Sequence, residues 1–257
     1  MIYFKNRMRL SYLMILFSLI TLLTPVSRFS QGKPVDDRIA ASDAGDCFIK
    51  QYRTRLDLGV VLDSLASNRF GLYVKDTGLL EDFMIDPRLL EHIDKKTAQQ
   101  AYVSWANTYF LGLLYMYQFP ESTSGVASVT IPEDITQLLR RARLRKVVIN
   151  FGTHDENTNS EKTKYLITNV AELREFVDLN ASLAELIKKH LPERPFETTT
   201  FKERMTAYGR YEKEVAVSQT TFAGRNEPLY VVHREFFTIY FVRDENEMKV
   251  LSLGIGH

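Results

Sequence analysis

The residue pair best suited to chemistry is a histidine and a glutamate two positions apart, His233 and Glu235. Both fall in a long β-rich run, residues 229–242, and alternate side chains of a strand share one face. Alternation would place the pair with the apolar side chains of Leu229, Val231, Phe237, Ile239 and Phe241. A histidine beside a carboxylate can act as an oriented general base, as in a hydrolase or isomerase. The alternative is a bulge at Arg234-Glu235, which would shift the register by one and leave the pair in solvent.

Aromatic residues at helical spacing, Tyr102, Trp105 and Tyr109, form a second group of candidates. Such a row either packs in the core or stacks on a ligand. We favour the core, because residues 97–117 carry apolar groups on nearly every side. Arg210 is a further candidate for ligand binding, and Arg210 or Tyr208 is positioned in the sequence to assist His233.

The standard signatures of metal, redox and nucleotide chemistry are missing from the sequence. It holds no His-Glu-x-x-His, Cys-x-x-Cys, Gly-x-Ser-x-Gly or Gly-x-x-x-x-Gly-Lys. Residues 155–166 begin like a calcium loop, but Ser160 replaces its glycine and Leu166 its closing glutamate. We therefore expect no metal and no cofactor. Cys47 is the single cysteine, which excludes an intrachain disulfide, and we interpret it as a buried small hydrophobe.

The N-terminus carries a pattern typical of export. A basic start is followed by residues 10–26, which hold no charge, and then by Ser30 and Gly32, which suit a cleavage site. The pattern predicts a signal peptide over residues 1–32 and a periplasmic or secreted protein. The alternative is an uncleaved membrane anchor formed by residues 10–26.

The charge balance argues against a nucleic-acid partner. Without residues 1–32, the 33 Lys and Arg would fall to 29, against 32 Asp and Glu. A slightly acidic chain lacks the field that attracts a phosphate backbone. Five cations crowd residues 140–146; we interpret them as a solvated helix face, with an anionic lipid or phosphate surface as the alternative.

The elements that must position these candidates belong to the α+β class. Composition predicts a flexible linker over residues 33–46 and a single domain over residues 47–257, with 45% hydrophobic residues in the whole chain. We expect a helix-rich N-terminal two-thirds packed on a C-terminal antiparallel β-meander. Its helices cover 47–65, with a break at Gly59, then 79–93, 97–117, 132–142 and 169–191, and its strands follow residue 211. Residues 146–151 suit either a strand or a helix. The layout is similar in shape to cone-shaped cystatin-like and nuclear-transport-factor-like (NTF2-like) folds.

Three hypotheses for function follow. The first is an exported, non-enzymatic domain that binds a small apolar molecule or an envelope protein in a cleft between sheet and helices. The second is a hydrolase or isomerase that uses His233 and Glu235 in that cleft. The third is a structural protein tethered to the membrane by its N-terminal segment.

Overall fold

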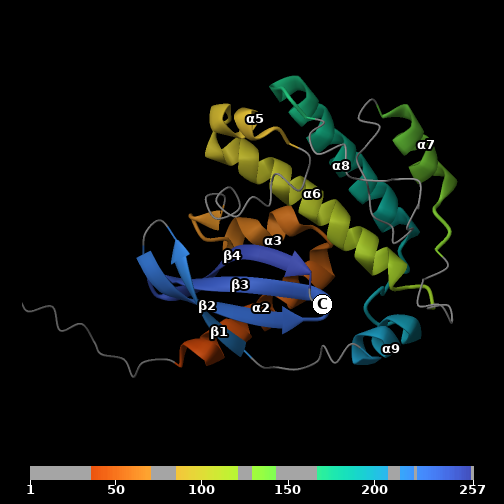
Figure 1. The fold of residues 1–257 in the computed structure, drawn as a ribbon. Helices are drawn as coiled ribbons and strands as arrows, with labels where there is room; N and C mark the ends of the chain where they lie inside the picture. The colour runs from red at the N-terminus through yellow and green to blue at the C-terminus, as the bar shows by residue number, and fades with distance from the viewer. Residues whose placement is uncertain are drawn as a thin grey trace, which may run out of the picture. The chain divides into compact units, whose positions relative to one another are not determined.

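The computed structural model describes residues 36–70, 85–120, 129–142, 167–207, 215–222 and 225–255. Residues 38–257 belong to one compact unit. Its helices are α2 (Asp37–Arg55), α3 (Leu58–Leu65), α5 (Pro87–His92), α6 (Lys95–Met116), α7 (Glu133–Arg141), α8 (Val170–His190) and α9 (Thr199–Ala207). Its strands are β1 (Val215–Phe222), β2 (Arg225–Arg234), β3 (Phe237–Asp244) and β4 (Glu247–Ile255). The predicted α+β class, with helices packed on a C-terminal antiparallel sheet, is confirmed (Figure 1).

The sheet is a meander in the order β1-β2-β3-β4, antiparallel throughout. Two of its hairpins turn through only two residues, because Arg234 pairs with Phe237 and Asp244 with Glu247. Both turns begin with a residue of positive φ, 55° at Glu235 and 56° at Glu245. Such a conformation suits the tight turns that follow the twist of paired strands.

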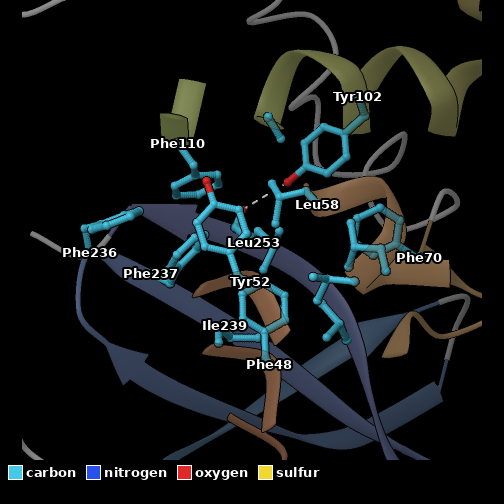
Figure 2. Packing of buried hydrophobic residues seen from close by; sticks show 14 of the residues in the cluster. Phe48, Tyr52, Leu58, Phe70, Tyr102, Phe110, Phe236, Phe237, Ile239 and Leu253 are labelled. Carbon is cyan, nitrogen blue, oxygen red and sulfur yellow. Dashed lines mark hydrogen bonds between the residues drawn. The ribbon is translucent and has the colours of Figure 1, made fainter. Parts of the chain in front are cut away.

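One face of the sheet, the inner face, carries Val232, Phe237, Ile239, Phe241 and Leu253. Figure 2 shows this face packed against aromatic side chains from the helices. Around Phe237, ring centroids lie at 5.3 Å for Phe48, 5.0 Å for Tyr52 and 4.3 Å for Phe110. Edge and tilted contacts at these distances stabilise a core beyond its buried area.

Helix α6 is apolar on most sides because it lies between two clusters. Its sheet side joins the core around Phe237, while Leu111 and Tyr115 pack with Leu183 of α8 and Ile135 of α7. This arrangement agrees with the interpretation of residues 97–117 as a core helix. Within the described ranges, no helix has the length and apolar character needed to cross a bilayer.

In the sequence, Asn169 followed by Glu172 is a capping-box pattern and Pro87 suits a first helical turn, and the structure has these residues at the starts of α8 and α5. Asn169 accepts a hydrogen bond from the Glu172 backbone N–H at 3.0 Å, and the Glu172 carboxylate accepts one from the Thr168 N–H at 2.7 Å. Pro87 lies in the first turn of α5. These contacts satisfy donors that would otherwise be unpaired at a helix N-terminus.

Helix α2 begins earlier than the composition predicts, because residues 37–46 are helical rather than a flexible linker. Ala41 and Gly45 are buried on the sheet side. A Cβ at Gly45 would lie 2.6 Å from a Val232 methyl group, so only glycine allows this close approach. The small residues that resemble a linker are therefore those that let α2 contact β2.

The break in the first predicted helix also lies elsewhere. The chain turns at Leu56, whose φ is 49°, and Asp57 then caps α3 by accepting a hydrogen bond from the Val60 N–H at 3.3 Å. Gly59, the predicted break, lies inside α3. The capping aspartate sets the boundary, because it pairs a donor that the new helix leaves free.

Candidate functional site

His233 and Glu235 do not share the environment that strand alternation predicts. Across the two-residue turn, even-numbered residues of β2 oppose odd-numbered residues of β3, so Val232 pairs with Ile239 and His233 with Thr238. His233 is therefore on the face opposite Phe237, where it is exposed, and its Nδ1 lies 3.0 Å from Thr238 Oγ1. This corrects the expected common face. The length of the hairpin loop decides which residues of β2 and β3 share a face, and strand periodicity alone does not reveal that length.

Glu235 lies in the turn itself and is buried, with 6% of its side chain exposed. Arg53, at the C-terminal end of α2, donates from Nε and Nη2 to its Oε1, the Nε contact at 2.9 Å. The Arg53 guanidinium also lies over the Phe196 ring, 5.1 Å from its centroid. Burial raises the pKa of Glu235, and the Arg53 charge opposes that rise. The buried carboxylate thus has an arginine partner where the histidine was expected.

Two oxygens in this region lack a hydrogen-bond partner among the described residues: Glu235 Oε2 and the Tyr52 hydroxyl. Burial, with smaller contributions from the charges of Asp57 and Glu235, raises the pKa of Tyr52, so this hydroxyl stays protonated. Both atoms are enclosed by protein. A substrate would therefore have no direct access to the Glu235 carboxylate, and the geometry gives no support to a catalytic pair.

The three aromatic candidates of α6 are buried to different degrees. Tyr102 is buried and donates its hydroxyl hydrogen to the Leu253 carbonyl at 3.2 Å (Figure 2). Trp105 and Tyr109 are half-buried and stacked, with centroids 5.0 Å apart. All three belong to, or pack against, the cluster under the sheet. Their positions agree with the core interpretation.

The remaining sequence candidates are placed as follows. Cys47 is exposed rather than buried, which corrects the expectation of a packed hydrophobe; it sits one position from the buried Phe48, on the solvent side of α2. Arg140 is exposed, as expected for a solvated helix face. Arg210, Tyr208, residues 143–151 and the calcium-like loop lie outside the described residues. Among those described, no group of three potential metal ligands occurs.

An open groove of about 780 Å³ runs between α3 and α8, with α6 as its floor. We call it the α3–α6–α8 groove. It is lined by Gly59, Leu62 and Asp63 of α3 with the flanking Asp57, Ala66, Ser67 and Asn68, by Lys96, Gln99, Gln100, Val103, Ser104 and Asn107 of α6, and by Val177, Ala181, Ala184, Glu185 and Lys188 of α8. None of these lining residues is aromatic. The groove borders the aromatic core, since Leu62 belongs to that cluster and Val103 and Val177 pack against it, and no sequence motif marks its position.

Polar groups on the floor of this groove are only partly used within the protein. Asn107 Oδ1 accepts from the Leu58 N–H at 2.9 Å, and Ser104 Oγ donates to the Val177 carbonyl at 3.1 Å. The side-chain amides of Gln99 and Gln100 have no hydrogen-bond partner in the part of the chain that the structure describes. The signal that could have found them is their spacing from Ser104 and Asn107, which puts amides and a hydroxyl on one stripe of a helix.

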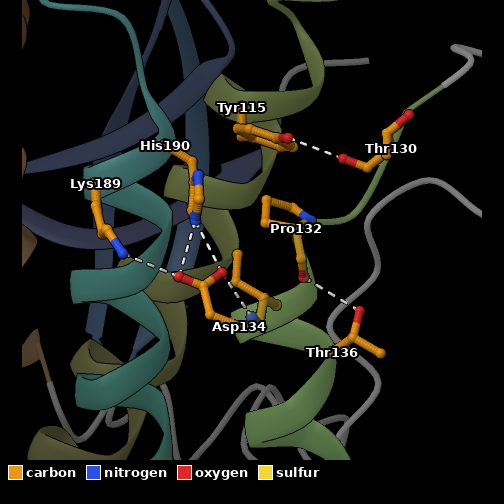
Figure 3. A network of polar contacts seen from close by, with 8 residues as sticks. Tyr115, Thr130, Pro132, Asp134, Thr136, Lys189 and His190 are labelled. Atoms are coloured by element: carbon orange, nitrogen blue, oxygen red, sulfur yellow. Dashed lines mark hydrogen bonds and ion pairs between the residues drawn. The ribbon is translucent and has the colours of Figure 1, made fainter.

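A second polar cluster joins α7 to α8 (Figure 3). His190 Nε2 lies 2.8 and 3.1 Å from the two carboxylate oxygens of Asp134, and Lys189 Nζ lies 3.3 Å from one of them. Desolvation raises the pKa of Asp134, but hydrogen bonds from His190 and Lys189 outweigh it and hold that pKa below its usual value. An acid at the start of α7 meets two bases at the end of α8, as helix dipoles favour. The cluster therefore has a structural explanation.

Comparison of the chain with models of protein families, with curated proteins and with solved structures finds no match.

Proposed function

We propose that the chain is a non-catalytic binding domain that holds an extended segment of another protein in the α3–α6–α8 groove. The observation that carries this proposal is a pair of amides, Gln99 and Gln100, that have no partner among the described residues and lie on the floor of a groove of about 780 Å³. A groove of this size is in the range of specific ligand sites. In the exported setting that residues 1–32 predict, the partner is another envelope protein or a secreted one.

A polypeptide fits the lining better than other ligand classes do. Each side-chain amide offers a donor and an acceptor side by side, which matches the N–H and C=O of a peptide group. Small side chains, among them Ala181 and Val103, leave apolar surface between the amides for short side chains of the ligand. Sugars and bases commonly stack on aromatic rings, and the lining has none.

The charges of the groove argue against a phosphate or a strongly charged ligand. Asp57, Asp63 and Glu185 face Lys96 and Lys188 in the lining, so neither sign dominates. Glu185 and Lys188 also neutralise each other, with the Lys188 Nζ 2.8 Å from the Glu185 carboxylate. Recognition in such a site depends on hydrogen bonds more than on steering by a net field.

The small apolar ligand that the sequence suggested has less support. The space between sheet and helices is filled by side chains that are almost completely buried, including Phe110, Phe237 and Ile239. A protein core packed to this degree leaves few voids larger than a water molecule. The open groove beside this core is the better place for a ligand.

The proposal can be tested by titrating three probes into the isotopically labelled protein and following backbone amide shifts in NMR spectra. The probes are a tetra-alanine peptide blocked at both ends, maltotriose and decanoate. We expect the peptide to shift amides of α3, α6 and α8 around Gln100 in a saturable way. Shifts produced only by maltotriose or decanoate, or no saturable shift at the groove, would contradict the proposal.

Gln100→Leu and Gln137→Leu are the matched variants. Gln137 is also an exposed helical glutamine, but it lies on α7, away from the groove. The loss of one hydrogen bond predicts a peptide affinity about 2- to 10-fold weaker for Gln100→Leu. The affinity of Gln137→Leu should equal that of the unmodified chain.

A further inference from the structure

The sheet has two edges, and among the described residues only the β4 edge has a covering segment. Beside β4, the Ser67 N–H donates to the Val250 carbonyl at 2.8 Å, and Ala66 forms a parallel bridge with Val250. The same strand carries the charged residues Glu247 and Lys249. Covering contacts and charges are the usual means by which a sheet edge avoids pairing with another chain.

The β1 edge has none of these features. In the described part of the chain β1 pairs with β2 alone, in an unbroken register from Val215↔Val232 to Phe222↔Arg225 (Figure 1). Its eight residues, VAVSQTTF, include no charge and no proline. Ala216 and Val217 are exposed, Val217 to 39%. Every second residue of such a strand directs its N–H and C=O away from its partner, so β1 offers a row of pairing groups.

The hairpin of β1 and β2 also extends beyond the rest of the sheet. Pairing of β2 with β3 begins at Tyr230↔Phe241, so residues 219–222 and 225–228 pair only with each other. Pro228 lies in this stretch, where β2 has no second neighbour that would need its missing N–H. A ribbon of two strands is marginally stable in water, and a third strand would support it.

We propose that β1 pairs antiparallel with β1 of a second copy of this chain, so that two copies share one continuous sheet. An uncharged strand brings no like charges together when it meets itself, and an antiparallel pair of identical strands has two-fold symmetry. Ala66 and Ser67 obstruct the β4 edge at Val250, so we expect the shared sheet to stop at two copies rather than grow. A strand from a different protein is the competing occupant.

The test is the mass of the purified chain, as its host produces it, measured by sedimentation up to roughly 100 μM, where weak pairing becomes populated. We expect a dimer, and amides of β1 that exchange more slowly with deuterium as the concentration rises. Val217→Lys and Ala216→Lys should each weaken the dimer at least tenfold, because each variant brings a lysine from both copies into the shared pair of edge strands. Val170→Lys, at a valine exposed to 43% on α8, should leave it unchanged.

A monomer throughout this range would overturn the proposal and would leave β1 to a different partner. A dimer that survives both lysine variants would overturn it as well, and so would masses that keep growing with concentration. Circular dichroism of each variant shows whether it is folded. If both lysine variants are unfolded, the exchange of β1 amides in the unmodified chain decides the question.

Discussion

Two regions of helix α6, one around Phe110 and one around Gln99 and Gln100, differ in how completely the protein uses their side chains. Toward the sheet, Phe110 meets Phe237 at a centroid distance of 4.3 Å, and the surrounding side chains are buried. Toward the groove, Gln99 is half-buried and Gln100 exposed, and neither amide has a partner among the described residues. One helix thus supplies both the centre of the core and the floor of a site.

This difference indicates which side chains could still form hydrogen bonds with a ligand. Aromatic side chains often line a ligand pocket, but in this protein they pack against one another in the core. Polar side chains that the fold leaves unpaired retain their hydrogen-bonding capacity for a partner, because satisfied groups gain little by exchanging one bond for another. The contrast predicts that substitutions on the sheet side change stability and that substitutions in the groove change binding.

The largest effect that would break or support this contrast is on stability. Phe237→Ala should lower the free energy of unfolding by about 3–5 kcal/mol, because it removes a completely buried ring and leaves a cavity. Gln100→Leu, at an exposed residue of α6, should change it by less than about 0.5 kcal/mol. Urea unfolding of the three proteins measures both values. Similar losses in the two variants would show that the groove is part of the core.

An intermediate effect distinguishes satisfied from unsatisfied hydroxyls within the core. Tyr102→Phe removes a hydrogen bond to the Leu253 carbonyl and should lower stability by about 0.5–1.5 kcal/mol. Tyr52→Phe removes a buried hydroxyl that has no partner among the described residues, and it should raise stability by about 1 kcal/mol. The same substitution thus has opposite signs at two buried sites. A loss of stability in both variants would show that the Tyr52 hydroxyl has a partner, for example a buried water.

The sequence predicted the fold class and the helix caps because these depend on local signals. Asn169 with Glu172 forms the expected caps, and the α+β class follows from helical spacing before strand alternation. The helical stretch 97–117 was found for the same reason, since its apolar residues surround the helix. Each of these features is determined within a few residues of chain.

The candidate site was not predictable in the same way, because it depends on how distant elements meet. The face of His233 is decided by a turn of two residues, and the partner of Glu235 comes from Arg53, far away in sequence. The glycine that lets α2 contact β2 resembles a linker residue when it is considered alone. The groove lies between α3, α6 and α8, and the sequence of a single helix does not predict how far it lies from the other two.

The smallest effect concerns Glu235, the one carboxylate that is buried among the described residues. Burial raises its pKa above the ordinary value of 4.5 despite the charge of Arg53. A raised pKa in the folded state means that the carboxyl group favours folding while it is protonated. This contribution is complete below about pH 4.5 and is lost as the pH rises through the raised pKa. Glu235→Gln keeps the shape of the side chain and removes the titration.

The stability of Glu235→Gln relative to the unmodified chain should therefore increase as the pH rises from about 4 to 7. Thermal unfolding of both proteins at several pH values measures this difference. A difference that instead falls with rising pH would mean that the Arg53 ion pair outweighs burial. The ion pair between Glu235 and Arg53 would then stabilise the folded protein, and the desolvation of the Glu235 carboxylate would cost less than its burial implies.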